Sequence, residues 1–408
     1  MGLLTCLEGV TDFEKSQEIL KSKHLIVKPY HNIGVYLVKY DKTNCDMSND
    51  DVKKCRSIVL ETGTNNVVSV SPYKSESLDS LTDIYKSNEK DNIVYEEFVD
   101  GTMINLFQYK DVYYISTRSC LGAQCRWFSS KTFNVMFNEC LDNYDLGKLK
   151  DTDNEYNYSF VLQHPDNTIV KQYQKPNLVL VAVTKITDNN IEYIDNKIGK
   201  AKLAEFGIQV DIPNVYKFDG LPEVHGYVDI MPESEQGIVL KYNNIRSKIR
   251  NEHYNYVRKL RGNSNNKQYM FFELRRQRLV EEYLSYFPDD RELFDAYRME
   301  LYAITNQLYN YYLDCFVRKN SDGTNILKHK EIDFEFKPLV SDLHNMYLTE
   351  KIITTKQRVV KYFNGLDTAK ILFVINYKKR IHMFSINPND IKGNDNVYGN
   401  ENGNENGN

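Results

Sequence analysis

Residues 96–102 read Glu96-Glu97-Phe98-Val99-Asp100-Gly101-Thr102, an acidic and apolar run that ends in an Asp-Gly pair. An Asp-Gly pair after a hydrophobic run is typical of a tight turn between two strands. Residues 93–98 on one side, and residues 103–109 and 112–117 on the other, carry the apolar and aromatic runs of strands. Since only Lys110 and Asp111 separate the last two runs, the pattern predicts a strand, a turn and then a β-hairpin.

The same pattern continues from about residue 25 to residue 260, where short apolar runs alternate with turn residues. The sequence predicts further strands at residues 158–163, 178–186, 191–194, 237–242 and 245–250. Runs joined by such short turns pair as antiparallel neighbours, and a few helices lie between them. This part of the chain is therefore predicted to be antiparallel α+β.

The character of the chain changes after the polar stretch at residues 262–266. Apolar residues then recur at spacings of four and three, at Leu293, Tyr297, Leu301, Ile304, Leu308, Tyr311 and Cys315. This spacing predicts one face of a long helix, and residues 269–286 and 336–347 carry helical spacing too. The tyrosines of this region could stack on RNA bases, but at helical spacing they are predicted to be core: Tyr302, Tyr309, Tyr311 and Tyr312.

Three domains follow from these patterns. Residues 1–262 form the α+β domain, and residues 263–386 form an all-α domain. Residues 387–408 are an Asn/Gly/Glu repeat with almost nothing to bury, so they are predicted to be a disordered tail.

The composition narrows the class of protein. A chain of 408 residues with 41% hydrophobic residues is long enough for a sizeable core. Its seven cysteines are scattered, which indicates reduced thiols in an intracellular protein. The net charge of −4 argues against a general nucleic-acid coat. His164, His225 and His253 lie far apart in the sequence, so they are predicted to be structural or exposed, and no metal site is predicted.

Residues 96–102 resemble the Lys-x-Asp-Gly motif of the RNA ligases of the T-even phage type, within the covalent nucleotidyltransferase superfamily, with Phe98 at the lysine. Five further segments resemble motifs of these ligases in the same order along the chain. Residues 52–60 resemble the Cys-Arg-Gly element, residues 115–119 a strand end with a basic residue, residues 160–170 the Phe-Glu segment, residues 235–241 Glu-Gly-x-Val, and residues 248–254 Lys-x-Lys followed by a tyrosine. The resemblance covers roughly residues 30–260. It implies an antiparallel-sheet nucleotidyltransferase core, an ATP-grasp-like ligase, ahead of the helical domain.

The resemblance also implies which residues do chemistry, and here the chain departs from the motifs. The nucleophilic lysine is Phe98, and a benzyl side chain has no lone pair with which to attack phosphorus. The two expected glutamates are Val161 and Gln236. Glu235 lies one residue early, and in a strand such a shift turns a side chain to the opposite face.

The positions that remain imply a site for phosphate without catalysis. The expected nucleotide-binding residues are Arg56, Asp100, Gly101, Arg118, Gln236, Lys248 and Arg250, with no catalytic residue and no metal ligand. Arginine suits phosphate because its planar fork contacts two oxygens at once. A divalent cation instead needs oxygen ligands, which valine does not supply.

Three hypotheses follow. The first is a catalytically degenerate RNA-ligase-like protein that binds nucleotide phosphates or RNA ends. The second is an active RNA ligase or nucleotidyltransferase with a relocated nucleophile, for which Lys74 is a candidate, although a surface position is the commoner role of a lysine. The third is a structural or interaction protein that retains only the fold.

The resemblance implies ATP or another nucleotide as the ligand, and magnesium only in the active alternative. Expected partners are nucleotides or single-stranded RNA ends, with a protein partner on the helical domain and no membrane. The Asn-, Lys- and Tyr-rich composition suits an AT-rich genome such as that of a large DNA virus. The expected location is therefore the cytoplasm, that of the host for a viral protein.

Overall fold

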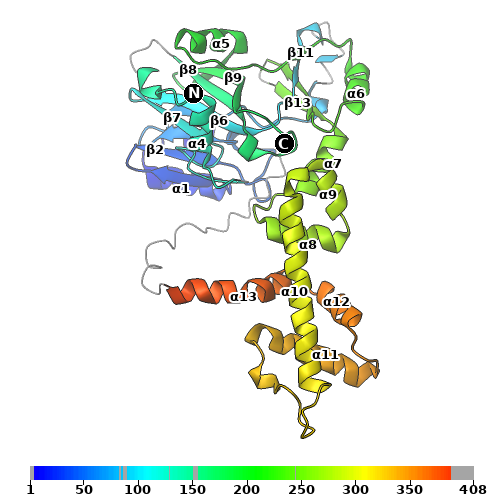
Figure 1. The fold of residues 1–408 in the computed structure, drawn as a ribbon. Coiled ribbons are helices and arrows are strands. Elements are labelled where there is room, and N and C mark those ends of the chain that lie inside the picture. Colours follow the sequence, from blue (N-terminus) through cyan, green and yellow to red (C-terminus); the bar gives the residue numbers. More distant parts are fainter. Residues whose placement is uncertain are drawn as a thin grey trace. The chain divides into compact units, whose positions relative to one another are not determined.

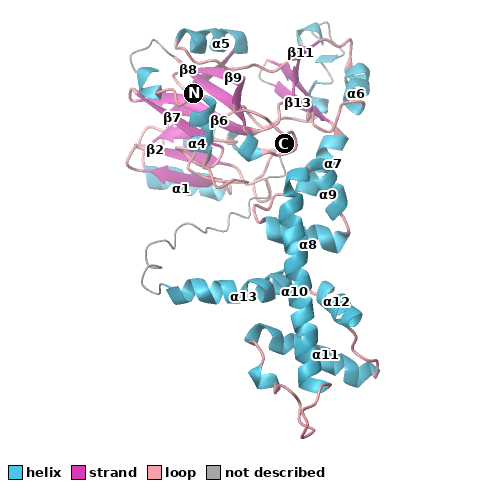
Figure 2. Ribbon diagram, in the orientation of Figure 1, coloured by secondary structure: helices cyan, strands magenta, loops and turns pink. Residues whose placement is uncertain are grey.

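The computed structural model describes residues 4–81, 84–85, 90–127, 129–149, 155–243 and 245–386. The predicted tail at 387–408 lies outside these residues. The chain divides into two compact units, residues 1–261 and the residues from Gly262 on. In the described residues the sheets belong to the first unit and the second is built of helices (Figure 2). The predicted α+β class, with antiparallel sheets and a helical C-terminal region, is confirmed.

The first sheet of unit 1 has the strand order β1-β2-β3-β4. Its strands are antiparallel and comprise β1 (Ile26–Tyr30), β2 (Val35–Lys39), β3 (Ile58–Glu61) and β4 (Val67–Val70). Tyr36 and Val38 of β2 face a core that also takes in Leu20 of α1 (Phe13–Ser22) and Val52 of α2 (Asp50–Lys54). The Asp12 carboxylate caps α1 by accepting from the Lys15 N–H.

The second sheet has the order β10-β9-β8-β6-β7 and carries the largest core of unit 1 (Figure 1). Its strands, again antiparallel, are β6 (Thr102–Tyr109), β7 (Val112–Thr117), β8 (Tyr156–Gln163), β9 (Asn177–Thr187) and β10 (Asn190–Ile194). Helices α4 (Phe133–Cys140) and α5 (Asn196–Glu205) cover one face. On the other face, Phe107 packs against Val35, Leu37 and Val59 of the first sheet.

Both hairpins of this sheet turn as the sequence predicts. Lys110 and Asp111 have φ values of 49° and 61°, and Tyr109 pairs with Val112. Asp188 and Asn189 likewise have φ values of 51° and 64°. Positive φ at both central residues defines the two-residue turn that matches the twist of antiparallel strands.

The third sheet has the order β11-β5-β12-β13, so the strand before the Asp-Gly pair lies beside the last strands of the unit. Its strands are β5 (Val94–Glu97), β11 (Val215–Tyr216), β12 (Gly237–Tyr242) and β13 (Ile245–Arg250), all antiparallel. Helix α6 (Leu221–Asp229) packs on one face through Val224 and Val228. Helix α7 (Glu252–Arg261) follows directly after β13.

Unit 2 is organised around α10 (Arg291–Phe316), which packs against α8, α11, α12 and α13. These helices are α8 (Lys267–Gln277), α9 (Val280–Tyr286), α11 (Lys337–Glu350), α12 (Lys356–Asn364) and α13 (Thr368–Ile386). Short 3-10 helices join the elements of both units: η1 (Thr5–Leu7), η2 (Leu78–Leu81), η3 (Lys90–Asn92), η4 (Leu146–Leu149), η5 (Pro165–Asn167), η6 (Pro288–Asp290), η7 (His329–Glu331) and η8 (Phe334–Phe336).

Two predictions for unit 2 need correction. Residues 269–286 are two helices, because Arg278 takes a left-handed φ of 63° and its N–H caps α8. Leu301, Leu308 and Cys315 of α10 are buried as predicted, but the first predicted position of this face is not. Leu293 is 38% exposed while its neighbour Phe294 is buried. Of the tyrosines assigned to the core, Tyr312 is buried but Tyr302 is 55% exposed. No described helix is long and apolar enough to cross a membrane.

We predict that Gly101→Ala destabilises unit 1 by at least about 2 kcal/mol. Gly101 has a φ of 142°, and an added Cβ would lie 2.4 Å from the Leu162 carbonyl oxygen. The single tryptophan of the chain, Trp127, packs against the core of the second sheet, so its fluorescence during urea unfolding reports on this unit.

Gly226→Ala is the matched control. Gly226 lies in α6, and an added Cβ would meet no atom within 4 Å. Alanine there should be neutral or stabilise by up to about 1 kcal/mol. Equal losses in the two variants would show that the Asp-Gly turn does not require glycine.

Candidate functional site

Phe98 lies between two sheets, at the point where the chain leaves β5 for β6. Its N–H donates to the Gly237 carbonyl oxygen at 2.9 Å, which fixes the residue beside the start of β12. The Lys248 Nζ lies 4.2 Å from the centroid of the Phe98 ring, and the Arg250 Cζ lies 5.5 Å from it. Both distances are those of cation–π contacts. Two predicted site residues thus meet at the position where the resemblance implies a lysine.

Strand β13 presents its charges on one face because side chains alternate along a strand. Arg246, Lys248 and Arg250 share that face, while Ile245 and Ile249 turn the other way into a hydrophobic core. Arg246 was not among the predicted site residues. The alternation of basic residues at positions 246, 248 and 250 was the signal that could have found it.

Basic residues from the other two sheets lie within electrostatic reach of the same place. Arg56 precedes β3 and Arg118 follows β7, as the resemblance implies, while Lys42 and Lys74 come from loops after β2 and β4. We call the whole group the cationic cluster, and it comprises Lys42, Arg56, Lys74, Arg118, Arg246, Lys248 and Arg250.

The pKa of Lys42 shows how close these charges are. Burial, and then repulsion from Arg118, Arg56, Arg250 and Lys74 in that order, lowers the pKa of Lys42 to about 8. Each of these four charges is positive. No sequence signal pointed to Lys42, because a loop lysine carries no periodicity.

Lys248 is affected in the same way at the centre of the cluster. Burial lowers the pKa of its amine well below the usual value, and Arg246, Arg56 and Arg250 add to the shift. A lysine whose charged form is disfavoured by both burial and like charges is a common mark of a functional site.

Two guanidinium groups of the cluster retain buried N–H donors. Within the described residues, the Arg246 Nε and Nη1 and the Arg118 Nε have no hydrogen-bond partner. Burial and repulsion from Arg56 lower the pKa of Arg246 to about 10, against the opposing effect of the Glu96 carboxylate. The Glu96 carboxylate already lies 2.6 Å from the Lys241 Nζ. Buried donors without acceptors are rare in proteins, so these N–H groups are candidates to contact a ligand.

Asp100 does not join the cluster, although it was predicted to bind nucleotide. Its carboxylate accepts from the Tyr254 hydroxyl at 2.7 Å and from the N–H groups of Val170 and Lys171 at 3.3 and 3.0 Å. Burial raises the pKa of this carboxyl despite those donors. The hydrogen bonds of Asp100 therefore hold the turn against α7 and against residues 170–171. Gly101 permits the close approach of this turn to β8.

Val161 and Gln236, the two positions where the resemblance implies a glutamate, are both buried. Val161 is buried in a small apolar cluster with Val99 and Val179. Gln236 is buried just before β12, and its carbonyl oxygen accepts from the Asn251 N–H. Glu235 lies before β12 begins, so the alternation argument does not apply to it, and its N–H instead closes a turn onto the Pro232 carbonyl oxygen. With Glu96 held by Lys241, these residues do not fit a divalent metal ion.

Glu139, His164 and Asp166 form a second cluster of ligand-type side chains in the described part of the chain. The His164 Nδ1 accepts from the Asp166 N–H at 3.0 Å, and this leaves Nε2 to donate to Glu139 at 2.7 Å. Lys131 forms ion pairs with both carboxylates, at 2.9 and 2.8 Å. Both ring nitrogens of His164 and both carboxylates therefore have partners, and their contacts stabilise the start of η5. This arrangement agrees with the predicted structural role of His164.

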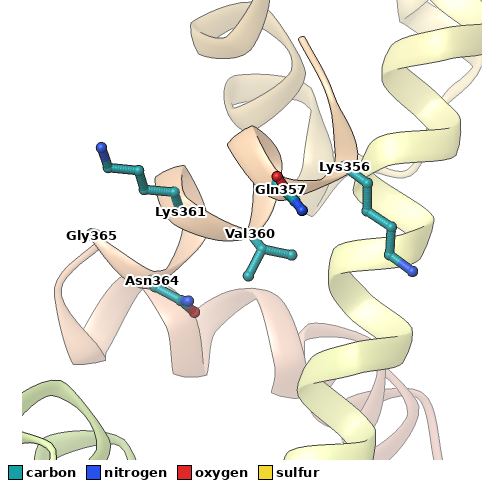
Figure 3. Close-up of a pocket in the computed structure, with 6 residues that line it drawn as sticks. All are labelled: Lys356, Gln357, Val360, Lys361, Asn364 and Gly365. Atoms are coloured by element: carbon teal, nitrogen blue, oxygen red, sulfur yellow. The ribbon is translucent and has the colours of Figure 1, made fainter.

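A pocket of about 590 Å³ lies along α12 in unit 2. Figure 3 shows that Lys356 and Lys361, which line it, point in different directions from the helix. The Lys356 Nζ donates to the Tyr302 hydroxyl, and Asn364 accepts from Arg275. The pocket has no convergent polar groups and shares no residue with the cationic cluster.

No family model matches the sequence, and no curated protein matches it. Among solved structures, an archaeal ATP-dependent RNA ligase is 12% identical with a TM-score of 0.44, over 93% of this chain and 81% of that one. An RNA ligase variant from Naegleria gruberi, bound to ATP and Mn, is 11% identical with a TM-score of 0.38, over 47% of this chain. The chain spans 58% of the length of that ligase. Both TM-scores lie below 0.5.

We predict that the free energy of unfolding of unit 1 depends on pH through Lys42. Its folded pKa of about 8 lies below the usual 10.5, so the unfolded state binds more protons between these values. Stability from this group therefore increases as pH rises from about 8 towards about 9.5. Lys42→Met should remove that increment in urea titrations followed by Trp127 fluorescence.

Cysteines and tyrosines titrate in the same pH range. Subtracting the free energy of unfolding of each variant from that of the unaltered protein removes their contribution. Lys197→Met on α5 is the control and should keep the slope of the unaltered protein. An identical slope in Lys42→Met would place Lys42 outside the electrostatic field of the cluster.

Proposed function

We propose that this chain is an RNA-ligase-like protein that binds the phosphates of nucleotides or of RNA ends and does not form a covalent nucleotide intermediate. The contact of Lys248 and Arg250 with the ring of Phe98 carries the proposal. It puts two cations where the resemblance implies a nucleophile, and it leaves the phenyl ring as their neighbour.

The electrostatics of the cluster support binding of an anion. Arg246 and Arg118 keep buried N–H donors, and guanidinium groups suit phosphate oxygens geometrically. The absence of catalysis follows from the substitutions, because Phe98 cannot attack phosphorus and Val161 cannot hold a metal.

One observation favours the active alternative. The Lys248 amine has a lowered pKa and lies beside the ring that replaces the expected lysine. A neutral amine close to cations is how a lysine becomes nucleophilic. In that alternative Lys248, rather than the half-buried Lys74, would be the relocated nucleophile.

We predict no covalent adduct when the full chain is incubated with ATP or GTP and magnesium or manganese. The readout is the intact mass, in which a nucleotide adduct adds one nucleoside monophosphate. Phe98→Lys should stay unlabelled as well, because residues that act as a unit in catalysis are strongly non-additive. A mass gain that maps to Lys248 would establish the active alternative.

We also predict that binding of a short 5′-phosphorylated single-stranded RNA depends on Lys248 and Arg250. Each contact with a single-strand phosphate contributes about 0.7 to the slope of log affinity against log salt. The double variant Lys248→Gln, Arg250→Gln should therefore flatten that slope by about 1.4. Fluorescence anisotropy at several salt concentrations measures it.

Lys197→Gln with Lys200→Gln removes two positive charges from α5, outside the cluster, and serves as the matched control. The control should retain the slope. Equal flattening in both double variants would mean that only net charge matters, and that no phosphate site exists at Phe98.

A further inference from the structure

The cationic cluster draws its charges from elements of all three sheets of unit 1. Arg56 and Arg118 come from the first and second sheets, and Arg246 comes from the third. Arg56 acts electrostatically on Lys42 and on Lys248, so it lies within reach of both. An orthophosphate group offers its oxygens within one small tetrahedron. A row of phosphates offers acceptors along a line.

The donors without partners lie on two different sheets. The Arg246 Nε and Nη1 belong to β13, and the Arg118 Nε belongs to the segment after β7. The Arg118 guanidinium is held near the Tyr40 ring, 5.0 Å from its centroid, and donates weakly to the Tyr40 carbonyl oxygen at 3.4 Å. A ligand that satisfies both guanidinium groups must therefore contact residues of two sheets.

We propose that the cluster selects a chain of phosphates, such as a 5′-triphosphate, over a single phosphate, and that it does so without a divalent metal ion. This inference rests on the proposed function and specifies its ligand. A triphosphate in water is ordinarily neutralised by magnesium, and here arginine and lysine side chains supply that charge. Val161 and Gln236, in place of the two acids, leave no oxygen ligands for the ion at those positions.

The state of the two lysines supports a ligand with several negative charges. Burial and like charges lower the pKa of Lys42 and of Lys248. A polyanion among these groups reverses the repulsion and favours protonation of both amines. Binding should then take up protons at alkaline pH and weaken as the pH rises above about 8.

Other titratable groups also face the two lysines or their neighbours. Arg246 faces Glu96, Tyr193 and Tyr40, while Arg250 faces Arg258, Tyr254 and Glu252. Lys42, with a pKa of about 8, is the group expected to take up protons between pH 7 and pH 9, and the lowered pKa of Lys248 acts in the same direction.

The test is titration calorimetry of the full chain with inorganic tripolyphosphate, pyrophosphate and orthophosphate in EDTA at pH 8.5. We expect affinity for tripolyphosphate to exceed that for orthophosphate by at least about 100-fold. Repeating the titration in buffers of different ionisation enthalpy measures the protons taken up. Added magnesium should weaken binding, because it competes for the phosphates.

Two variants locate the site. Arg246→Met and Arg118→Met should each reduce the affinity for tripolyphosphate by at least about tenfold, and Lys197→Met should not change it. Lys42→Met should reduce the proton uptake while leaving measurable binding. Thermal melts of each variant identify any that fails to fold, and either arginine variant suffices.

The outcomes separate the two proposals. Equal binding of orthophosphate and tripolyphosphate, with retained binding of 5′-monophosphorylated RNA, overturns the preference for a chain of phosphates and leaves the proposed function standing. Tripolyphosphate binding that requires magnesium overturns the metal-free part. No binding of any phosphate or RNA overturns both.

Discussion

Repulsion between buried cations is the constraint around which the candidate site is built. Arg246, Lys248 and Arg250 lie on one face of β13 because the opposite face packs into a hydrophobic core through Ile249. A shift of one residue in the pairing of β12 with β13 would turn the charges into that core and the apolar side chains to the opposite face. The core therefore fixes the charges in place, and their mutual repulsion destabilises the folded chain, an effect that the proposed anionic ligand would relieve.

The contacts of the Asp-Gly pair in this chain are structural ones. The carboxylate of Asp100 is occupied by Tyr254 of α7 and by two backbone N–H groups, while Gly101 allows the turn to approach β8. The segment that carries Phe98 is thereby fixed at its C-terminal side, and the Phe98 N–H fixes it to Gly237. Such anchoring keeps the ring in position whether or not a ligand is bound.

Much of this arrangement follows from local patterns. The bounds of β7, β12 and β13 agree with the predicted strands, because alternating side chains and short turns are properties of a few neighbouring residues. The break at Arg278 could not be predicted, since a non-glycine residue there takes a left-handed conformation. Lys42 was not found from the sequence, and Lys74 was considered only as a relocated nucleophile, for another reason. They come from loops, and only the packing of three sheets brings them to Arg118 and Arg250.

The phenyl ring of Phe98 is compatible with the cluster in a way that a lysine would not be. A lysine at this position would add a positive charge close to Lys248 and Arg250, with Val161 and Gln236 offering no carboxylate to offset it. The π-face of phenylalanine instead attracts both cations. With no carboxylate at positions 161 and 236, the aromatic ring is the neighbour that stabilises these cations, and under the proposal above they are the groups that contact a chain of phosphates.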